Sequence, residues 1–301
     1  MAHRPILITG GTGQLALALE GAARAGGLPA IRIGRPAFDF DQPDSIQAGF
    51  QGVNPSLVLN AAAYTAVDAA EDDAEAAARA NRDGPATLAA LCAAAGIPLL
   101  HVSTDYVFDG LKGAPYVETD PTAPQGVYGA TKLAGEQAVL ASGARALILR
   151  TSWVYAPTGK NFVRTMLNAA LKTSHLRVVA DQQGCPTAAE DLAEAMIAIA
   201  ARILADGWQD AFAGIFHAAG TGSTTWHDFA VTIFAEAARH GRPIPTVEAI
   251  ATADWPTRAH RPADSQLDCA RLERVFGLRL PPWRESVTRT VDTLLRAAPS
   301  A

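Results

Sequence analysis

The chain has 301 residues, of which 49% are hydrophobic and 18% are charged. At about 100–200 residues per domain, this length indicates two domains, or one large domain with an appendage. The composition excludes a mostly disordered chain, and a net charge of −5 shows no basic bias toward nucleic acid. The sequence therefore predicts a globular protein that does not bind nucleic acid.

The three cysteines, Cys92, Cys185 and Cys269, are widely spaced and form no Cys-x-x-Cys pair. Their odd number argues against a disulfide scaffold and favours a reducing compartment, the cytoplasm. No apolar run reaches the ~18 residues of a transmembrane helix, and no apolar region of a signal peptide follows Met1. We therefore expect a cytoplasmic protein without a membrane contact.

Short apolar runs alternate with helical periodicity through the first 150 residues. Continuous apolar strands are typical of a sheet covered on both faces, and their alternation with helices indicates parallel crossovers. This pattern predicts a Rossmann-type, doubly wound parallel α/β sheet. The expected strands are 5–9, 30–33, 56–60, 99–103 and 146–150, and the expected helices are 15–25, 69–80, 85–95 and 128–140.

After Arg150 the pattern is less regular and predicts a smaller C-terminal α/β domain. We expect residues 1–155 to form the first domain, residues 156–301 to be mainly the second, and the chain to return to the first domain around 186–220. The expected elements are helices 162–171, 191–204, 226–239 (capped by Thr224 or Thr225) and 284–295, strand 176–179, and a loop over 255–265.

A glycine-rich turn, Gly10-x-x-Gly13-x-x-Ala16, joins the first expected strand to the first helix. Glycines there let the backbone turn tightly and approach a pyrophosphate at the N-terminus of the following helix. An ordinary turn is the alternative, but the position at the first strand–helix junction favours dinucleotide binding. The turn is not a P-loop, because no Gly-Lys-Ser/Thr follows it.

The end of the second strand is where an acidic residue would contact the adenosine ribose, about 20 positions after the glycines. Gly34-Arg35 occupies that place. Because an arginine suits a 2′-phosphate, the sequence favours NADPH over NADH. The alternative is a solvated arginine in the turn before Pro36.

Tyr128 and Lys132 are four positions apart and lie on one face of the expected helix. A tyrosine with the ordinary pKa of about 10 exchanges protons poorly at neutral pH, and a nearby ammonium group lowers that pKa. The same lysine can bind a nicotinamide ribose. Thr104, next to the strand that ends at Ser103, adds a hydroxyl that can orient a substrate carbonyl or the tyrosine. Together with the glycine-rich turn, these residues have the order and spacing of an extended short-chain dehydrogenase/reductase.

Longer blocks, in collinear order along nearly the whole chain, resemble the dTDP-4-dehydrorhamnose reductase family. These blocks are 60–68, 103–110, 128–136, 150–155, 181–187, 217–220, 226–229 and 261–262. The resemblance implies that the 4-keto group of dTDP-4-dehydro-L-rhamnose is reduced to give dTDP-L-rhamnose, with NADPH or NADH as cofactor. It also implies a small-molecule dTDP-sugar partner and a homodimer. Residues 1–155 would then be the NAD(P)-binding domain, and residues 156–301 would be mainly the sugar-nucleotide-binding domain.

The same resemblance assigns roles to individual residues. It implies that Tyr128 protonates the developing alkoxide, that Lys132 holds the cofactor ribose and tunes Tyr128, and that Thr104 lies at the sugar carbonyl. Substrate contacts are implied for Thr104, Asp105 and Trp153. Cofactor contacts are implied for Gly10, Thr12, Gly13, Gln14, Leu15, Arg35, Asp39, Phe40, Ala61, Ala62, Ala63, Thr65, Tyr128 and Lys132.

Some alternatives stay open at this point. Asp105 could cap the turn that follows it, and Trp153 could be a core residue. Glu190 and Asp292 match or approach magnesium positions at a dimer contact of some relatives. Ala18 stands at a third such position and cannot be a ligand, so we expect no metal.

Two other functions also remain possible. A regulatory subunit of the methionine adenosyltransferase type resembles this family without catalysing reduction; block 150–153 and the intact catalytic set argue against it. A reductase or epimerase acting on another nucleotide sugar would keep the same catalytic set.

Overall fold

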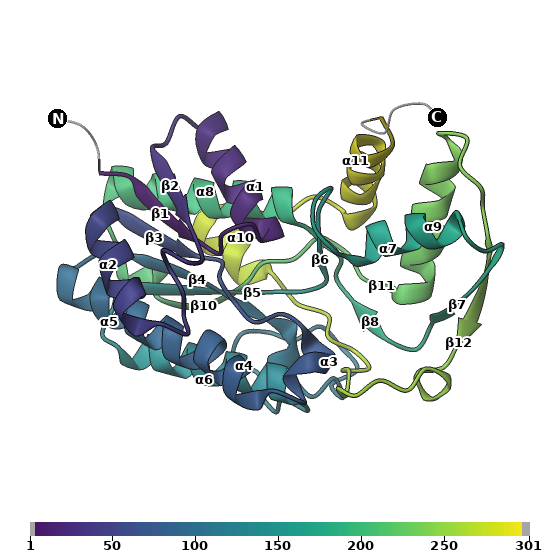
Figure 1. Ribbon diagram of the computed structural model, residues 1–301, viewed down its shortest axis with the longest axis horizontal. Helices are drawn as coiled ribbons and strands as arrows, with labels where there is room; N and C mark the ends of the chain where they lie inside the picture. The colour runs from purple at the N-terminus through teal and green to yellow at the C-terminus, as the bar shows by residue number, and fades with distance from the viewer. Residues whose placement is uncertain (1–3, 297–301) are drawn as a thin grey trace.

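A six-stranded parallel sheet lies at the centre of the larger of two lobes in the computed structural model, which describes residues 4–296 (Figure 1). The strand order is β10-β5-β4-β3-β1-β2. The chain passes from β1 to β2 toward one edge of the sheet and from β3 to β4 and β5 toward the other, so the strand order reverses between β1 and β3. Open α/β sheets bind ligands at such a reversal. This arrangement confirms the predicted Rossmann-type fold. The strands are β1 (Ile6–Thr9), β2 (Ala30–Ile33), β3 (Leu57–Asn60), β4 (Leu99–Thr104), β5 (Ala146–Thr151) and β10 (Gly214–His217).

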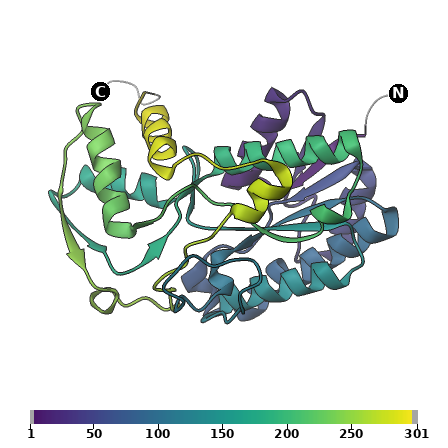
Figure 2. The same cartoon turned by 180° about the vertical axis from the view of Figure 1, so that it is seen from behind.

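Helices cover both faces of this sheet, which is why its strands are apolar without alternation. On one face α1 (Gln14–Ala25), α8 (Ala189–Asp206) and α10 (Ala270–Phe276) share a core with the sheet. Figure 2 shows α8 running along this face. The other face is covered by α2 (Pro43–Val53), α5 (Gly84–Ala95) and α6 (Val127–Ala141). Thus α8, β10 and α10, although late in the sequence, belong to the sheet lobe.

The single helix expected over 69–80 is wrong. The structure has α3 (Val67–Ala70), α4 (Ala74–Ala78) and a π-helical turn over Arg79–Asp83 that continues into α5. The break arises because Asp73 adopts a non-helical backbone and its side chain accepts a hydrogen bond from the Ala76 N–H at 3.0 Å.

The elements that lie where the sequence predicts none include α2, β10, α10 and β12 (Thr246–Ile250). Each is short or weakly apolar on its own, and β12 is mostly exposed. The two strands form because a neighbouring strand supplies the pairing: β5 pairs with β10, and β7 (His175–Val179) pairs with β12.

The smaller lobe packs three helices around its own apolar core. They are α7 (Phe162–Ala170), α9 (Trp226–Ala238) and α11 (Trp283–Arg296). Thr225 caps α9 by accepting a hydrogen bond from the Asp228 N–H at 3.1 Å, as predicted. Two short pairs complete the lobe: β6 (Val154–Tyr155) with β9 (Thr187–Ala188), and β8 (Gln183–Gly184) with β11 (Thr224–Thr225). Within residues 4–296, no helix has the length and apolar character needed to cross a membrane.

Candidate active site

The glycine-rich turn follows β1 and leads into α1. Gly10 and Gly11 have φ angles of +112° and +53°, and a Cβ on Gly10 would lie 3.0 Å from the backbone of Ala61. Glycine is needed here because it tolerates both the backbone conformation and the close approach of the chain after β3. Gly13 begins α1 in an extended conformation without a side-chain cap. The first N–H groups of α1 therefore have no side-chain partner at this end.

Three more residues predicted to bind the cofactor lie at this turn. Thr12 is exposed at the start of α1, whereas Gln14 is partly buried. Leu15 is only 8% exposed and belongs to the core beneath α1. Its backbone alone can face a dinucleotide.

A row of buried polar side chains across three adjacent strands holds the loop after β3. Thr9 donates a hydrogen bond to Asn60 Oδ1 at 2.6 Å, and Asn60 Nδ2 lies 2.8 Å from His101 Nδ1. Burial lowers the pKa of His101 well below its usual range, so the neutral imidazole accepts this hydrogen bond. Asn60 Oδ1 also accepts from the Ala62 N–H at 3.2 Å, which holds the start of the loop. The loop carries the predicted cofactor residues Ala61, Ala62, Ala63 and Thr65.

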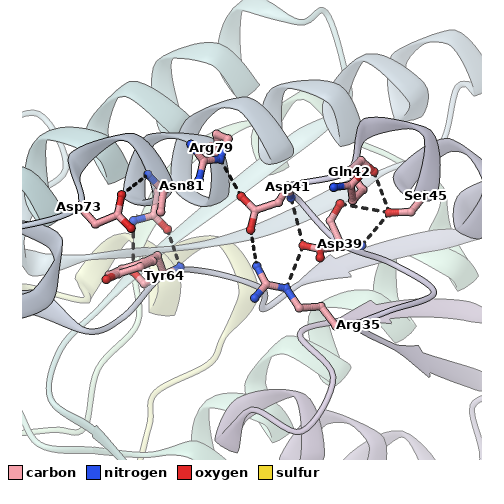
Figure 3. A network of polar contacts seen from close by, with 10 residues as sticks. Arg35, Asp39, Asp41, Gln42, Ser45, Tyr64, Asp73, Arg79 and Asn81 are labelled. Carbon is pink, nitrogen blue, oxygen red and sulfur yellow. Dashed lines mark hydrogen bonds and ion pairs between the residues drawn. The ribbon is translucent and has the colours of Figure 1, made fainter.

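The structure adds Asn81, which the sequence analysis does not single out. This buried residue of the π-helical turn accepts a hydrogen bond from the Tyr64 N–H at 2.8 Å and donates to the Tyr64 carbonyl at 3.1 Å. It also donates to the Thr131 hydroxyl at 3.2 Å. Asn81 therefore ties the loop after β3 to α6, and Figure 3 shows it beside Tyr64. A polar residue within an alanine-rich stretch is the only sequence signal for it.

Arg35 follows β2 and lies in a network of ion pairs (Figure 3). Its Nε is 2.8 Å from Asp39 Oδ1 and its Nη2 is 2.8 Å from Asp41 Oδ2. Arg79 Nε pairs with the other oxygen of Asp41 at 2.8 Å. The network holds the Arg35 guanidinium at the end of β2, and the two carboxylates compete with any phosphate for it.

Phe40 is largely a core residue. Its side chain is 7% exposed, and a Cβ on Gly84 would lie 2.2 Å from its ring. The contact that the resemblance implies at this position is therefore left to the Phe40 backbone and to Asp39.

The three predicted catalytic residues lie together at the ends of β4 and α6. Thr104 is the last residue of β4, while Tyr128 and Lys132 lie on one face of the first two turns of α6. Gly129 permits this approach, because a Cβ there would lie 2.2 Å from the carbonyl oxygen of Tyr106. The Tyr106 ring lies edge-on to the ring of Tyr128, with 5.5 Å between centroids.

Burial governs the protonation of these groups. It raises the pKa of Tyr128 to about 12, although a hydrogen bond with Thr104 acts to lower it. The net shift of the Tyr128 pKa is therefore upward, and the phenol stays protonated at neutral pH; the lowering effect of Lys132 stays a prediction. Burial lowers the pKa of Lys132 to about 8, and the Glu136 carboxylate opposes that shift. Lys132 Nζ donates a hydrogen bond to the Val102 carbonyl at 2.6 Å.

Asp105 follows Thr104 and is 2% exposed. Its carboxylate accepts hydrogen bonds from the hydroxyls of Thr104 (3.0 Å), Ser152 (3.0 Å) and Ser265 (2.5 Å). Burial raises the pKa of Asp105 to about 6, against the lowering effect of the three hydroxyls. The side chain thus joins β4 to the end of β5 and to a distant segment, and it is enclosed by protein.

An Asp105→Asn variant should change how stability depends on pH. The native carboxyl has a pKa of about 6 and an unfolded one a pKa of about 3.9, so the native state binds more protons between these values. The contribution of this group is therefore fully present below about pH 4 and is lost as the pH rises through about 6. From pH 4 to pH 7 the wild type should lose about 2–3 kcal/mol relative to the variant in urea unfolding. An identical pH dependence of the two proteins would contradict this.

Trp153 has a φ of +48°, which is rare for a bulky residue and is a mark of functional sites. Its indole covers Gly184, where a Cβ would lie 2.4 Å from Cε2. It also stacks on Trp226, with ring centroids 3.5 Å apart and an interplanar angle of 6°. Trp153 remains partly exposed, and both indoles pack against the apolar core of the smaller lobe. We call this pair the Trp153–Trp226 wall.

Across residues 4–296, no group of three or more His, Cys, Asp or Glu side chains is placed to hold a metal ion. Asp292 instead pairs with His240 at 2.6 Å. The absence of a catalytic metal stays a prediction.

Comparisons with known proteins agree with this geometry. The family described as RmlD substrate binding domain matches residues 4–296. The dTDP-4-dehydrorhamnose reductase of Sinorhizobium fredii is 46% identical over 291 residues, which cover 96% of this chain and 97% of that protein.

Two solved structures of dTDP-4-dehydrorhamnose reductases also resemble the chain. The one from Clostridium acetobutylicum has a TM-score of 0.88 and 35% identity, covering 96% of this chain and 99% of that one. The one from Bacillus anthracis, a complex with NADP, has a TM-score of 0.87 and 32% identity, covering 96% and 98%. These matches confirm the resemblance of the sequence blocks, and the chain belongs to the dTDP-4-dehydrorhamnose reductase family.

Proposed function

We propose that this chain reduces the 4-keto group of dTDP-4-dehydro-L-rhamnose to give dTDP-L-rhamnose, with NADPH or NADH as cofactor. The observation that carries the proposal is the set Thr104, Tyr128 and Lys132, assembled next to the cofactor loop in a member of this family. The relatives named above are reductases of this ketone by name, and one of them is a complex with NADP.

The residues at the end of β1 fit a nicotinamide dinucleotide. The close approach of Gly10 to Ala61 and of Gly34 to Gly11, where a Cβ would lie 2.4 Å from the Gly11 Cα, supports a backbone surface without side chains. The N-terminus of α1, with its partial positive charge, suits a pyrophosphate at this surface. When bound, the reduced nicotinamide supplies hydride to C4 of the sugar. We propose that the cofactor is held by the set of residues, from Gly10 to Lys132, for which the family resemblance implies cofactor contacts.

Tyr128 is the proposed acid. With a pKa of about 12 it carries its proton at neutral pH, and it donates that proton to the sugar oxygen as the ketone becomes an alcohol. Thr104 lies at the keto oxygen, where its hydroxyl, held by Asp105, orients the Tyr128 hydroxyl. Lys132, whose pKa is about 8, remains mostly protonated at neutral pH, so it can bind ribose hydroxyls and balance the phenolate left on Tyr128.

We assign cofactor binding to the sheet lobe and sugar binding mainly to the smaller lobe within residues 156–301. The exposed part of the Trp153–Trp226 wall supports this assignment, because a flat aromatic surface suits a sugar nucleotide. Asp105 is enclosed, so we propose that it holds the Thr104 hydroxyl in place and meets the sugar only through its backbone.

The proposal includes a cytoplasmic location, which the three free cysteines support, and no nucleic-acid or membrane partner. A homodimer is the assembly to test, by sedimentation of the purified protein with and without NADPH.

Oxidation of NADPH and NADH by the purified protein tests the function. The substrate is dTDP-4-dehydro-L-rhamnose generated in situ, and NMR identifies the product. We expect rapid oxidation that yields dTDP-L-rhamnose. Failure to oxidise a cofactor that is still bound would favour another nucleotide sugar or the non-catalytic regulatory subunit.

Arg35→Ala should reduce the preference for NADPH over NADH by roughly 10-fold in kcat/KM, because a charge-assisted hydrogen bond to a 2′-phosphate is lost. The matched control is Arg79→Ala, which removes the other arginine paired with Asp41 but leaves the end of β2 intact. If Arg35→Ala keeps the wild-type ratio of the two cofactors, the solvated-arginine interpretation is correct.

A further inference from the structure

Gln14, on the first turn of α1, reaches out of the sheet lobe to the loop before α7. Asn161 Nδ2 donates a hydrogen bond to Gln14 Oε1 at 2.8 Å, although the two residues are 147 positions apart. A Cβ on Gly159 would lie 2.9 Å from Gln14 Cγ, and Gly159 has a φ of +71°. The loop is therefore shaped closely around the Gln14 side chain.

Asn161 organises this loop and starts α7. Its Oδ1 accepts from the Arg164 N–H at 3.1 Å, which caps the helix. Its amide group also donates to the carbonyls of Ala156 (2.8 Å) and Thr158 (3.2 Å). One side chain therefore fixes both the path of the loop and its attachment to the glycine-rich turn.

The next residue extends this connection to the aromatic wall. Phe162 packs on Trp226, with 4.7 Å between ring centroids, and Trp226 stacks on Trp153. A continuous series of contacts thus runs from Gln14 through Asn161 and Phe162 to the wall. The glycine-rich turn belongs to the sheet lobe, whereas Trp226 belongs to the smaller lobe, so contacts between the lobes set the spacing of the turn and the wall.

We propose that Asn161 is a positioning residue for the sugar nucleotide. Its hydrogen bond to Gln14 sets the distance of the Trp153–Trp226 wall from the glycine-rich turn, and so the place of the sugar relative to the cofactor. This inference rests on the proposed function, which supplies the ligand of the wall. Small displacements of this kind weaken binding and orientation without altering any reacting group.

Two variants remove the hydrogen bond from opposite sides. Asn161→Ser keeps a good helix cap and loses the amide. Gln14→Met keeps the length of the side chain and leaves the bonds of Asn161 to its own loop in place. At saturating NADPH, each should raise the KM for dTDP-4-dehydro-L-rhamnose about 2- to 10-fold, more than it changes kcat. The double variant should raise KM no further than either single variant.

Thr165→Val is the matched control, because the exposed Thr165 hydroxyl bonds only to the Asn161 carbonyl within its own helix and does not touch Gln14. It should keep the wild-type KM. An unchanged KM in Gln14→Met, or effects of the two variants that multiply in the double variant, would overturn the proposal.

Calorimetric titration of dTDP into the same proteins, at saturating NADP⁺, separates this proposal from the proposed function. If the wild type does not turn over, the function fails, but a dTDP Kd that rises 2- to 10-fold in both single variants still supports the positioning role. If the wild type reduces the substrate and the variants have the wild-type Kd for dTDP and the wild-type KM for the sugar nucleotide, only the positioning role fails.

Discussion

Tyr128→Phe should reduce kcat by about 10²–10⁴-fold, the usual contribution of a positioned general acid. The phenol is the only proposed proton donor to the sugar oxygen, and its pKa of about 12 keeps it protonated over the working pH range. Phenylalanine preserves the ring that packs against Tyr106, so the fold and the cofactor surface remain. Steady-state kinetics give kcat, and fluorescence titration should give a nearly unchanged Kd for NADPH.

Tyr106→Phe is the matched control, since it removes one phenol oxygen from the neighbouring ring. It should lose far less activity than Tyr128→Phe. Wild-type turnover in Tyr128→Phe would remove the proposed acid, whereas equal losses in both variants would point to a general disturbance of the site.

Glu136→Gln should lower the free energy of unfolding by about 3–5 kcal/mol. Arg150 and Glu136 are 2% and 1% exposed, and the guanidinium donates hydrogen bonds to the carboxylate at 2.9 and 2.6 Å. Removing the carboxylate charge leaves the buried Arg150 guanidinium without a counter-charge. No ion pair then offsets the free energy needed to remove the guanidinium from water. Urea unfolding at neutral pH measures the loss.

The double variant Glu136→Leu with Arg150→Met is the control, because apolar side chains of similar size often replace a buried ion pair at little cost. It should recover most of the stability lost in Glu136→Gln. A Glu136→Gln protein within about 1 kcal/mol of the wild type would contradict the argument. A double variant as unstable as the single one would assign the loss to packing.

Much of the fold follows from patterns local to the sequence. The apolar runs that became β1, β3, β4 and β5 predicted a sheet covered on both faces, and the sheet has that form. Local patterns failed where a short segment depends on a partner, as at β10 and β12. They failed also at Asp73, where one side chain breaks an otherwise helical stretch.

The candidate site divides in the same way. Tyr128 and Lys132 could be paired from sequence because four residues on a helix return to one face, and the glycine-rich turn could be located because only glycine tolerates its backbone. Their pKa values could not be foreseen. Burial, a property of the whole fold, raises the pKa of Tyr128 although a lysine lies one turn away.

What the sequence by itself determined is the sheet, the glycine-rich turn, the placing of Tyr128 and Lys132 on one helix face, and the family. Only the tertiary structure decided which distant residues hold the site in place by hydrogen bonds. These bonds join Asn81 to Tyr64, Ser265 to Asp105, and Asn161 to Gln14. These partners are 17, 160 and 147 positions apart. Helical and strand periodicity relates residues within one element, whereas such contacts depend on how separate elements pack, so no spacing in the sequence encodes them.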